Sequence, residues 1–157
     1  MSKKTDKPIC MMKKFLILIV ALCATFALSA QTYKVGDLYD VNGKKGVVFE
    51  VSEDGQHGQI IAADIVSEKM TWGKAMEWAK QLKDGWYIPS IEEMNILLSV
   101  REEILAKTVQ STKAYSGYYW TSTEFNADCA WMVSIKTNSR GGCYKANLFT
   151  VRPISKF

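Results

Sequence analysis

The segment Gly85-Trp86-Tyr87-Ile88-Pro89-Ser90-Ile91-Glu92-Glu93-Met94 decides how the chain folds. Pro89 ends an extended stretch, because its ring fixes φ and removes an amide donor. Ser90 followed three residues later by Glu93 is the capping-box pattern that opens a helix. Apolar residues then recur at helical spacing, at Ile91, Met94, Leu97 and Leu98. The segment therefore predicts a change from extended to helical structure in the middle of the chain.

The chain on either side of this segment predicts one further helix and two groups of strands. A helix is predicted over Trp72–Leu82, with Thr71 as its N-cap and Asp84-Gly85 as its stop signal. Residues 31–66 read as a β-meander with turns at Asn42-Gly43 and Asp54-Gly55. Helical character continues or restarts over 101–108. Later strands are predicted over 118–122, 130–135, 143–149 and 150–154. This order predicts an α+β fold, with two helices packed on antiparallel sheet(s) after an N-terminal β-meander.

Residues 1–30 have the three parts of a secretory signal peptide. A basic start is followed by the apolar run Phe15–Leu28, and Leu28-Ser29-Ala30 offers a small residue at the cleavage position. The run has 14 residues, whereas a membrane-spanning helix needs about 18 or more. An uncleaved membrane anchor is the alternative. We expect export and cleavage, which leave residues 31–157 as a single domain without a membrane span, in the periplasm, on the cell surface or outside the cell.

The net charge of +4 belongs to this leader. Residues 1–30 contain five lysines and one aspartate, so residues 31–157 hold equal numbers of acidic and basic side chains. A basic domain or patch is the usual sign of nucleic-acid binding. The neutral domain gives no such sign, and nucleic acid is not expected as a partner.

Cys129 and Cys143 are the two cysteines of residues 31–157, and they predict a disulfide. An even pair in an oxidising compartment normally forms a bridge, and these two fall on neighbouring predicted strands. The bridge would stabilise the domain by about 3 kcal/mol on the chain-entropy account. A reactive or metal-binding thiol pair is the alternative. With one histidine in the chain, His57, and no CxxC pattern, no metal site is expected.

Four motifs, in order, resemble a known family. Gly85–Met94, preceded by Trp72–Leu82, resembles the "GW-hydrophobic-P-S/T-x-x-E-L" segment of the DUF1566 family, which is also named for the C-terminal domain of a Legionella collagen-like adhesin. Tyr119–Glu124 is similar to the family's "YWSST-E" element. Ala130–Val133 and Val151–Ile154 resemble its closing strands. Residues 71–157 are thus identified as the family-like core of the domain.

The resemblance implies a C-type-lectin-like fold, similar also to the formylglycine-generating enzymes, and an extracellular role in adhesion or glycan contact. Calcium-dependent C-type lectins bind sugar with a Glu-Pro-Asn or Gln-Pro-Asp triplet and a Trp-Asn-Asp. Here Glu124-Phe125-Asn126 lacks the proline, and no Trp-Asn-Asp occurs. Glu124, Asn126 and Asp128 place oxygen atoms at alternate positions, which makes calcium a candidate ion, although a solvated loop is the commoner meaning of such a cluster. No cofactor is expected.

No catalytic residue is predicted. Arg140-Gly141-Gly142-Cys143 is similar to a segment of the formylglycine-generating enzymes, but their second catalytic cysteine is not matched. His57 sits in a glycine-flanked turn, and neither a nucleophile elbow nor a phosphate-binding glycine loop occurs. An enzyme related to that superfamily is the least favoured alternative.

The composition favours a non-catalytic binding module. All seven tyrosines and five tryptophans lie in residues 31–157, and aromatic faces hold sugar rings, although the same side chains also build cores. We expect the loops 124–128 and 136–142 to form the ligand face beside the disulfide. The partner would be a glycan or a surface protein; a structural or interaction subunit of a surface assembly is the alternative. The candidate ligand-binding residues are Glu124, Asn126, Asp128, Asn138, Arg140 and Tyr144.

Overall fold

The computed structural model describes residues 31–108 and 117–157, which belong to one compact unit, Gln31–Phe157. The expected signal peptide lies outside the described residues. Within the described ranges no helix is long and apolar enough to cross a membrane. The elements are, in chain order, β1 (Leu38–Val41), β2 (Lys44–Val51), β3 (Gly58–Ala62), α2 (Trp72–Ala79), α3 (Ile91–Ser99), α4 (Arg101–Thr108), β4 (Tyr119–Glu124), β5 (Cys129–Ser134), β6 (Ser139–Tyr144) and β7 (Ile154–Lys156).

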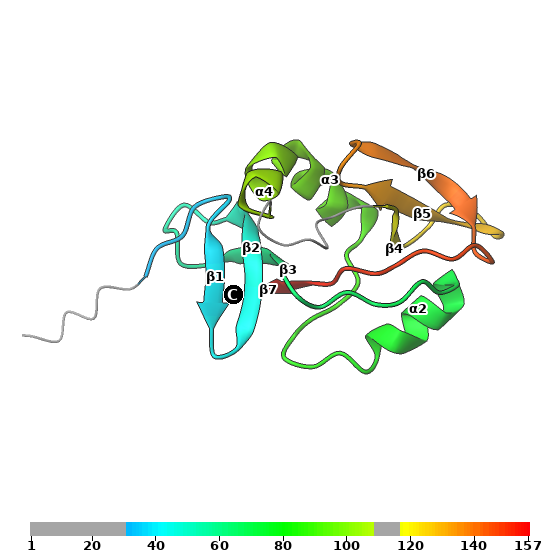
Figure 1. Cartoon of the computed structure of the whole chain (residues 1–157), viewed down its shortest axis with the longest axis horizontal. Coiled ribbons are helices and arrows are strands. Elements are labelled where there is room, and N and C mark those ends of the chain that lie inside the picture. The colour runs from blue at the N-terminus through cyan, green and yellow to red at the C-terminus, as the bar shows by residue number, and fades with distance from the viewer. Residues whose placement is uncertain (1–30, 109–116) are drawn as a thin grey trace, which may run out of the picture. The chain divides into compact units, whose positions relative to one another are not determined.

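The strands form two antiparallel sheets (Figure 1). The first has the order β1-β2-β3-β7 and the second the order β4-β5-β6. The predicted α+β class, with helices packed against antiparallel sheets, is confirmed. The first sheet is more than the predicted N-terminal meander, because its last strand comes from the end of the chain: Ile61 of β3 pairs with Ile154 of β7.

The segment before β7 connects the two sheets. Within it, Phe149 makes a single bridge with Met70 and Thr150 one with Tyr119; Ile154, the first residue of β7, makes another with Tyr87. The strands predicted over 143–149 and 150–154 therefore differ from the structure. Strand β6 ends at Tyr144, because the amide of Asn147 bonds back to the Tyr144 carbonyl at 2.9 Å and turns the chain.

The capping box predicted from Ser90 and Glu93 is present at the start of α3. The Ser90 hydroxyl accepts from the Glu93 amide at 3.2 Å, and the Glu93 carboxylate accepts from the Ser90 amide at 2.8 Å. The other Glu93 oxygen accepts from the Tyr87 hydroxyl at 2.7 Å. At α2, by contrast, Thr71 is the N-cap residue but makes no side-chain capping bond. Helical structure restarts after Val100, as α4.

The largest core cluster packs α3 and α4 against both sheets. Its fully buried members are residues of β2, β3, the two helices, β4, β5 and β7, for example Phe49, Met94, Leu97, Ile104 and Val133. A second cluster lies between α2 and the β4-β5-β6 sheet, around Trp120. The two sheets are therefore joined through shared cores, and the second sheet is held firmly enough to present a binding surface.

Arg152 is structural. Its side chain is 4% exposed, and its Nη1 donates to the carbonyl oxygens of Ala62 at 2.8 Å and Ala63 at 3.2 Å. The guanidinium also lies 6.0 Å from the centre of the Tyr119 ring. It ties the end of β3 to the segment that leads into β7, which gives the family's Arg-Pro motif a role in folding.

Candidate functional site

The six residues predicted to bind ligand fall at two opposite ends of the second sheet. Glu124, Asn126 and Asp128 lie in the β4–β5 connection, and Tyr144 ends β6 beside them, opposite Cys129. Asn138 and Arg140 lie at the β5–β6 turn. Since a strand rises about 3.3 Å per residue, Arg140 is roughly 13 Å from Tyr144 along β6. Asn138 and Arg140 therefore lie apart from the other four predicted residues, at the far end of the sheet.

At the other end of the sheet, Asn138 and Arg140 stabilise the fold. Asn138 has φ +55° and makes the turn, a conformation that asparagine tolerates. The Arg140 Nη1 donates to the Asn95 side-chain oxygen on α3 at 2.7 Å. Arg140 thus fastens the hairpin to the helix that covers this part of the sheet.

The β4–β5 connection has a defined shape. The Asn126 side-chain oxygen accepts from the amides of Asp128 at 3.0 Å and Cys129 at 2.8 Å. The Glu124 carboxylate pairs with the Lys145 ammonium at 3.0 Å, and Lys145 also donates to the Ala127 carbonyl at 2.8 Å. A calcium ion at this loop would have to displace the Lys145 ammonium. Within residues 31–108 and 117–157 no group of three or more acidic, histidine or cysteine side chains could hold a metal.

Cys129 and Cys143 are not bonded to each other in the structure, which differs from the predicted disulfide. In the β5–β6 ladder Cys129 lies opposite Tyr144, and Cys143 lies opposite Ala130. Directly opposed residues share a face, and successive residues alternate faces. The two thiols therefore point to opposite sides of the sheet. The Cys143 sulfur instead accepts from the Asn147 side-chain amide at 2.9 Å.

We expect the intact mass of residues 31–157, which lack Cys10 and Cys23, to equal that of the fully reduced form when they are purified without reductant. Both thiols should react with a maleimide once the protein is denatured, and replacing both by serine should change the free energy of unfolding by less than about 1 kcal/mol. A mass lower by two hydrogen atoms, with no reactive thiol, would mean that β6 pairs with β5 in another register.

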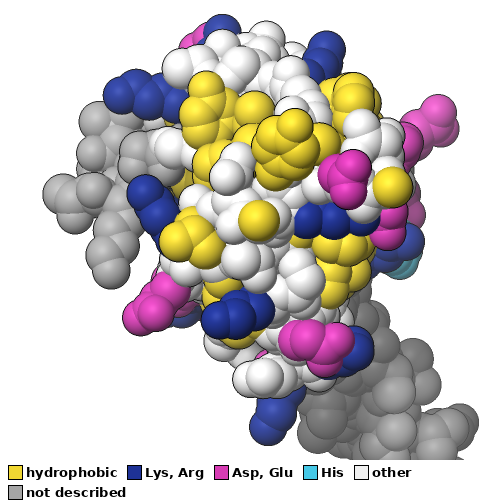
Figure 2. Space-filling model, turned by 90° about the vertical axis from the view of Figure 1, so that its right-hand side faces the viewer, with side chains coloured by type: hydrophobic (Ala, Val, Ile, Leu, Met, Phe, Trp, Pro, Cys, Tyr) yellow, Lys and Arg dark blue, Asp and Glu magenta, His cyan; other side chains and the backbone are white. Residues whose placement is uncertain are grey.

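The face that carries Cys129 also carries three exposed or half-exposed aromatic rings, which we call the aromatic face: Phe125, Trp131 and Tyr144. Phe125 is 49% exposed and Tyr144 is 67% exposed. The Phe125 and Trp131 rings meet edge to face, with centroids 4.8 Å apart and an interplanar angle of 72°. Figure 2, which looks onto this end of the domain, shows hydrophobic side chains gathered in its upper part.

Gly142 makes room for this arrangement. It lies opposite Trp131 in the ladder, and a methyl group on it would lie 2.5 Å from the Phe125 ring. Glycine inside a strand often marks such a close approach. The Gly141-Gly142 pair in the sequence was the available signal. The sequence does not show that this pair lies against Phe125, because only the fold brings the β4–β5 loop over β6.

The residues considered for catalysis do not form a catalytic group. His57 is exposed in the β2–β3 connection, with its Nδ1 3.2 Å from the Asp54 carboxylate. Hydrogen bonds from the Ser52 hydroxyl, the Gln56 amide and His57 lower the pKa of Asp54 to about 2. These contacts shape a surface turn.

The comparisons with known proteins agree with the motifs. The family model described as the Lcl C-terminal domain matches residues 44–155. This match confirms the family resemblance found in the sequence. Among solved structures, botrocetin matches with 12% sequence identity over 75% of this chain and 98% of its own, at a TM-score of 0.44. No curated protein matches the chain.

Proposed function

The chain belongs to the Lcl C-terminal domain family, and we propose on this basis that it is an exported, non-catalytic binding module that holds a glycan on the aromatic face. The observation that supports the glycan is the group of Phe125, Trp131 and Tyr144 on one side of the second sheet. Exposed rings that gather on one face of a sheet are candidates for a binding surface, because burying them against a ligand removes apolar area from water.

The chemistry of the rings suits a sugar. An aromatic ring carries negative charge on its face, which attracts the weakly positive C–H groups of a pyranose ring. The edge-to-face contact with Trp131 and the close fit over Gly142 fix the Phe125 ring before a ligand arrives. A preformed surface loses little side-chain freedom on binding, which favours affinity.

A polar edge beside the rings can bind hydroxyl groups. The Glu124 carboxylate and Lys145 ammonium form an ion pair next to the β4–β5 loop, and the Asp128 side chain is exposed there. Carboxylates accept and ammonium groups donate hydrogen bonds, so together they match sugar hydroxyls, which do both. Asn126 contributes indirectly, because its side chain holds the loop in shape.

Replacing Tyr144 by alanine should weaken glycan binding about tenfold, the effect of losing roughly 1.4 kcal/mol from a central contact. The first step is a glycan array, with and without calcium, to find a ligand for the full chain. Isothermal titration with that ligand then gives the affinity of each variant. Tyr118→Ala is the matched control, because Tyr118 is also exposed but stacks on Phe149, 5.7 Å away.

Gly142→Ala tests the same face in a second way. The new methyl group should push the Phe125 ring off Trp131 and weaken binding, while the melting temperature stays nearly unchanged because Phe125 is exposed. The proposal is wrong if no glycan binds under any condition. It is also wrong if Tyr118→Ala weakens binding as much as Tyr144→Ala does.

A further inference from the structure

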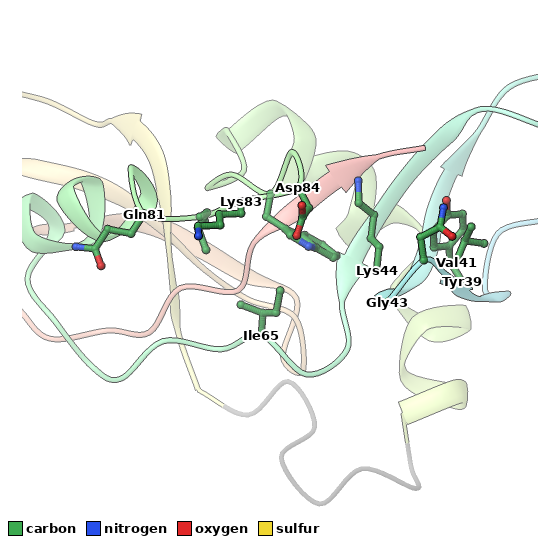
Figure 3. A pocket seen from close by; sticks show the side chains of 11 residues that line it. Tyr39, Val41, Gly43, Lys44, Ile65, Gln81, Lys83 and Asp84 are labelled. Atoms are coloured by element: carbon green, nitrogen blue, oxygen red, sulfur yellow. The ribbon is translucent and has the colours of Figure 1, made fainter.

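An open cleft of about 510 Å³ lies on the first sheet, away from the aromatic face. One side is the β1–β2 hairpin, residues 39–44, and the other is the chain after α2, residues 81–86, with Ile65 between them. In Figure 3, Lys44 stands on the hairpin side, while Gln81, Lys83 and Asp84 stand on the other. The volume falls within the usual range for small-molecule sites, about 300–1,000 Å³.

The Lys44 ammonium is held in a fixed position in this cleft. It donates to the Ser155 hydroxyl at 2.9 Å and to the Lys156 carbonyl at 3.3 Å. Ser155 is 1% exposed and donates in turn to the Gly85 carbonyl at 2.9 Å. Strand β7 thus holds the ammonium group directly, and the turn at Gly85 supports it through Ser155.

The backbone conformation, rather than lack of space, calls for glycine at position 85. A methyl group on Gly85 would lie 3.8 Å from the Lys44 Nζ and 3.4 Å from the Ser155 hydroxyl oxygen. Gly85 also has φ +75°, which side chains rarely adopt. The turn after α2 therefore depends on glycine at this position, and it places the Gly85 carbonyl where the Ser155 hydroxyl donates to it.

The charge of Lys44 is not neutralised by the described part of the chain. Both of its oxygen partners are neutral, and no carboxylate of residues 31–108 or 117–157 forms an ion pair with it. The cleft lining contains a second cation, Lys83, and a single acidic residue, Asp84. A half-buried ammonium with neutral partners gains from an added anion, because water screens it less than at the open surface.

The rest of the lining combines two polar side chains, Asn42 and Gln81, with an apolar wall. Tyr39, Ile65 and Leu82 line the cleft and are each half-buried, and Trp86 closes it with 7% of its surface exposed. The Lys44 ammonium lies 5.9 Å from the centre of the Trp86 ring. An apolar wall beside a fixed charge is the usual design of a small-ligand site.

We propose that this cleft is a second ligand site, which binds a small organic anion. Its acidic group, a carboxylate or a sulfonate, pairs with the Lys44 ammonium, and its ring or other apolar body lies against Tyr39 and Ile65. On the opposite side of the cleft, the positive charge of Lys83 attracts the anion and the negative charge of Asp84 repels it. The cleft shares no residue with the aromatic face, so the anion proposal and the glycan proposal can each be disproved without affecting the other.

The test is an NMR titration of the full chain, labelled with nitrogen-15, against benzoate, benzenesulfonate and the uncharged benzamide. Either anion should shift the amide resonances of Lys44, Lys83 and Gly85 and leave Tyr144 unshifted. Benzamide should bind at least about tenfold more weakly than the better anion. Comparing the two anions shows which acidic group the site prefers.

Three variants separate the proposal from a purely structural role of Lys44. Lys44→Met should weaken anion binding about tenfold, whereas Lys45→Met should not, because Lys45 is exposed and pairs with Asp40 at 3.6 Å. Lys83→Gln should also weaken binding, and it replaces Lys44→Met if that variant fails to fold, because the Lys83 side chain forms no ion pair within the described residues.

Asp84→Asn should tighten anion binding, because it removes the one negative charge of the lining. Asparagine also tolerates the φ of +56° found at this position. The proposal is overturned if benzamide binds as well as the anions, if neither anion shifts the cleft resonances, or if Asp84→Asn weakens binding.

Discussion

Replacing Trp120 by alanine is expected to lower the free energy of unfolding by about 4 kcal/mol, the cost of removing a fully buried aromatic side chain. Trp120 is 0% exposed, and its ring packs on Phe149 with centroids 4.8 Å apart. Its indole nitrogen donates to the Met70 carbonyl at 2.9 Å, so the substitution also leaves that oxygen without its donor. Urea denaturation of the two proteins measures the difference.

Trp131→Ala is the matched comparison. Trp131 is only half-buried and contacts Phe125 at the surface, so its loss should cost about 1–2 kcal/mol of stability but remove glycan binding. Should Trp120→Ala not fold, Trp120→Phe keeps most of the packing and tests the bond to Met70. Equal losses of stability at the two tryptophans would contradict the assignment of one to the core and the other to the ligand face.

The second large effect is expected at the start of α3. Glu93→Ala should lower the free energy of unfolding by about 2 kcal/mol, because the Ser90 amide and the Tyr87 hydroxyl both lose their acceptor. Glu92→Ala is the control. Glu92 is exposed in the same first turn and acts only on the helix dipole, worth about 0.5 kcal/mol. Similar losses for the two glutamates would show that the capping box contributes little.

The same contact makes stability depend on alkaline pH. Burial raises the pKa of Tyr87, and the hydrogen bond it donates to Glu93 raises it further. An unfolded tyrosine loses its proton near pH 10, while the folded one keeps it to higher pH. Stability should therefore be complete below about pH 10 and fall as the pH rises above it. Tyr87→Phe should make that fall shallower in urea denaturation series, and an unchanged slope would contradict the assignment.

Local sequence patterns were sufficient for the elements that form from neighbouring residues. The capping box needs only Ser90 and Glu93 three residues apart, and the Asn42-Gly43 turn needs only two residues that accept positive φ, as both do here, at 51° and 80°. The family followed from motifs of the same local kind. The charge balance of the leader and of the remaining residues also follows from counting alone.

Relations between distant segments could not be predicted in this way. The predicted disulfide differs from the structure because the register of β5 against β6 decides which face of the sheet each residue takes. Strand assignments alone place Cys129 and Cys143 on neighbouring strands, but in the actual register they are offset by one residue and lie on opposite faces. Likewise, β7 pairs with β3, which lies far from it in the sequence, although the end of the chain shows only a short apolar run.

The sequence by itself determined the α+β order of elements, the family and the neutral, aromatic-rich composition of residues 31–157. The tertiary structure alone decided which aromatic residues are core and which are surface, and where charges gather. Phe125 reaches Gly142 over a folded loop, and Lys44 reaches Ser155 across more than a hundred residues. The physical reason is that these contacts depend on packing and register, which a local pattern does not encode.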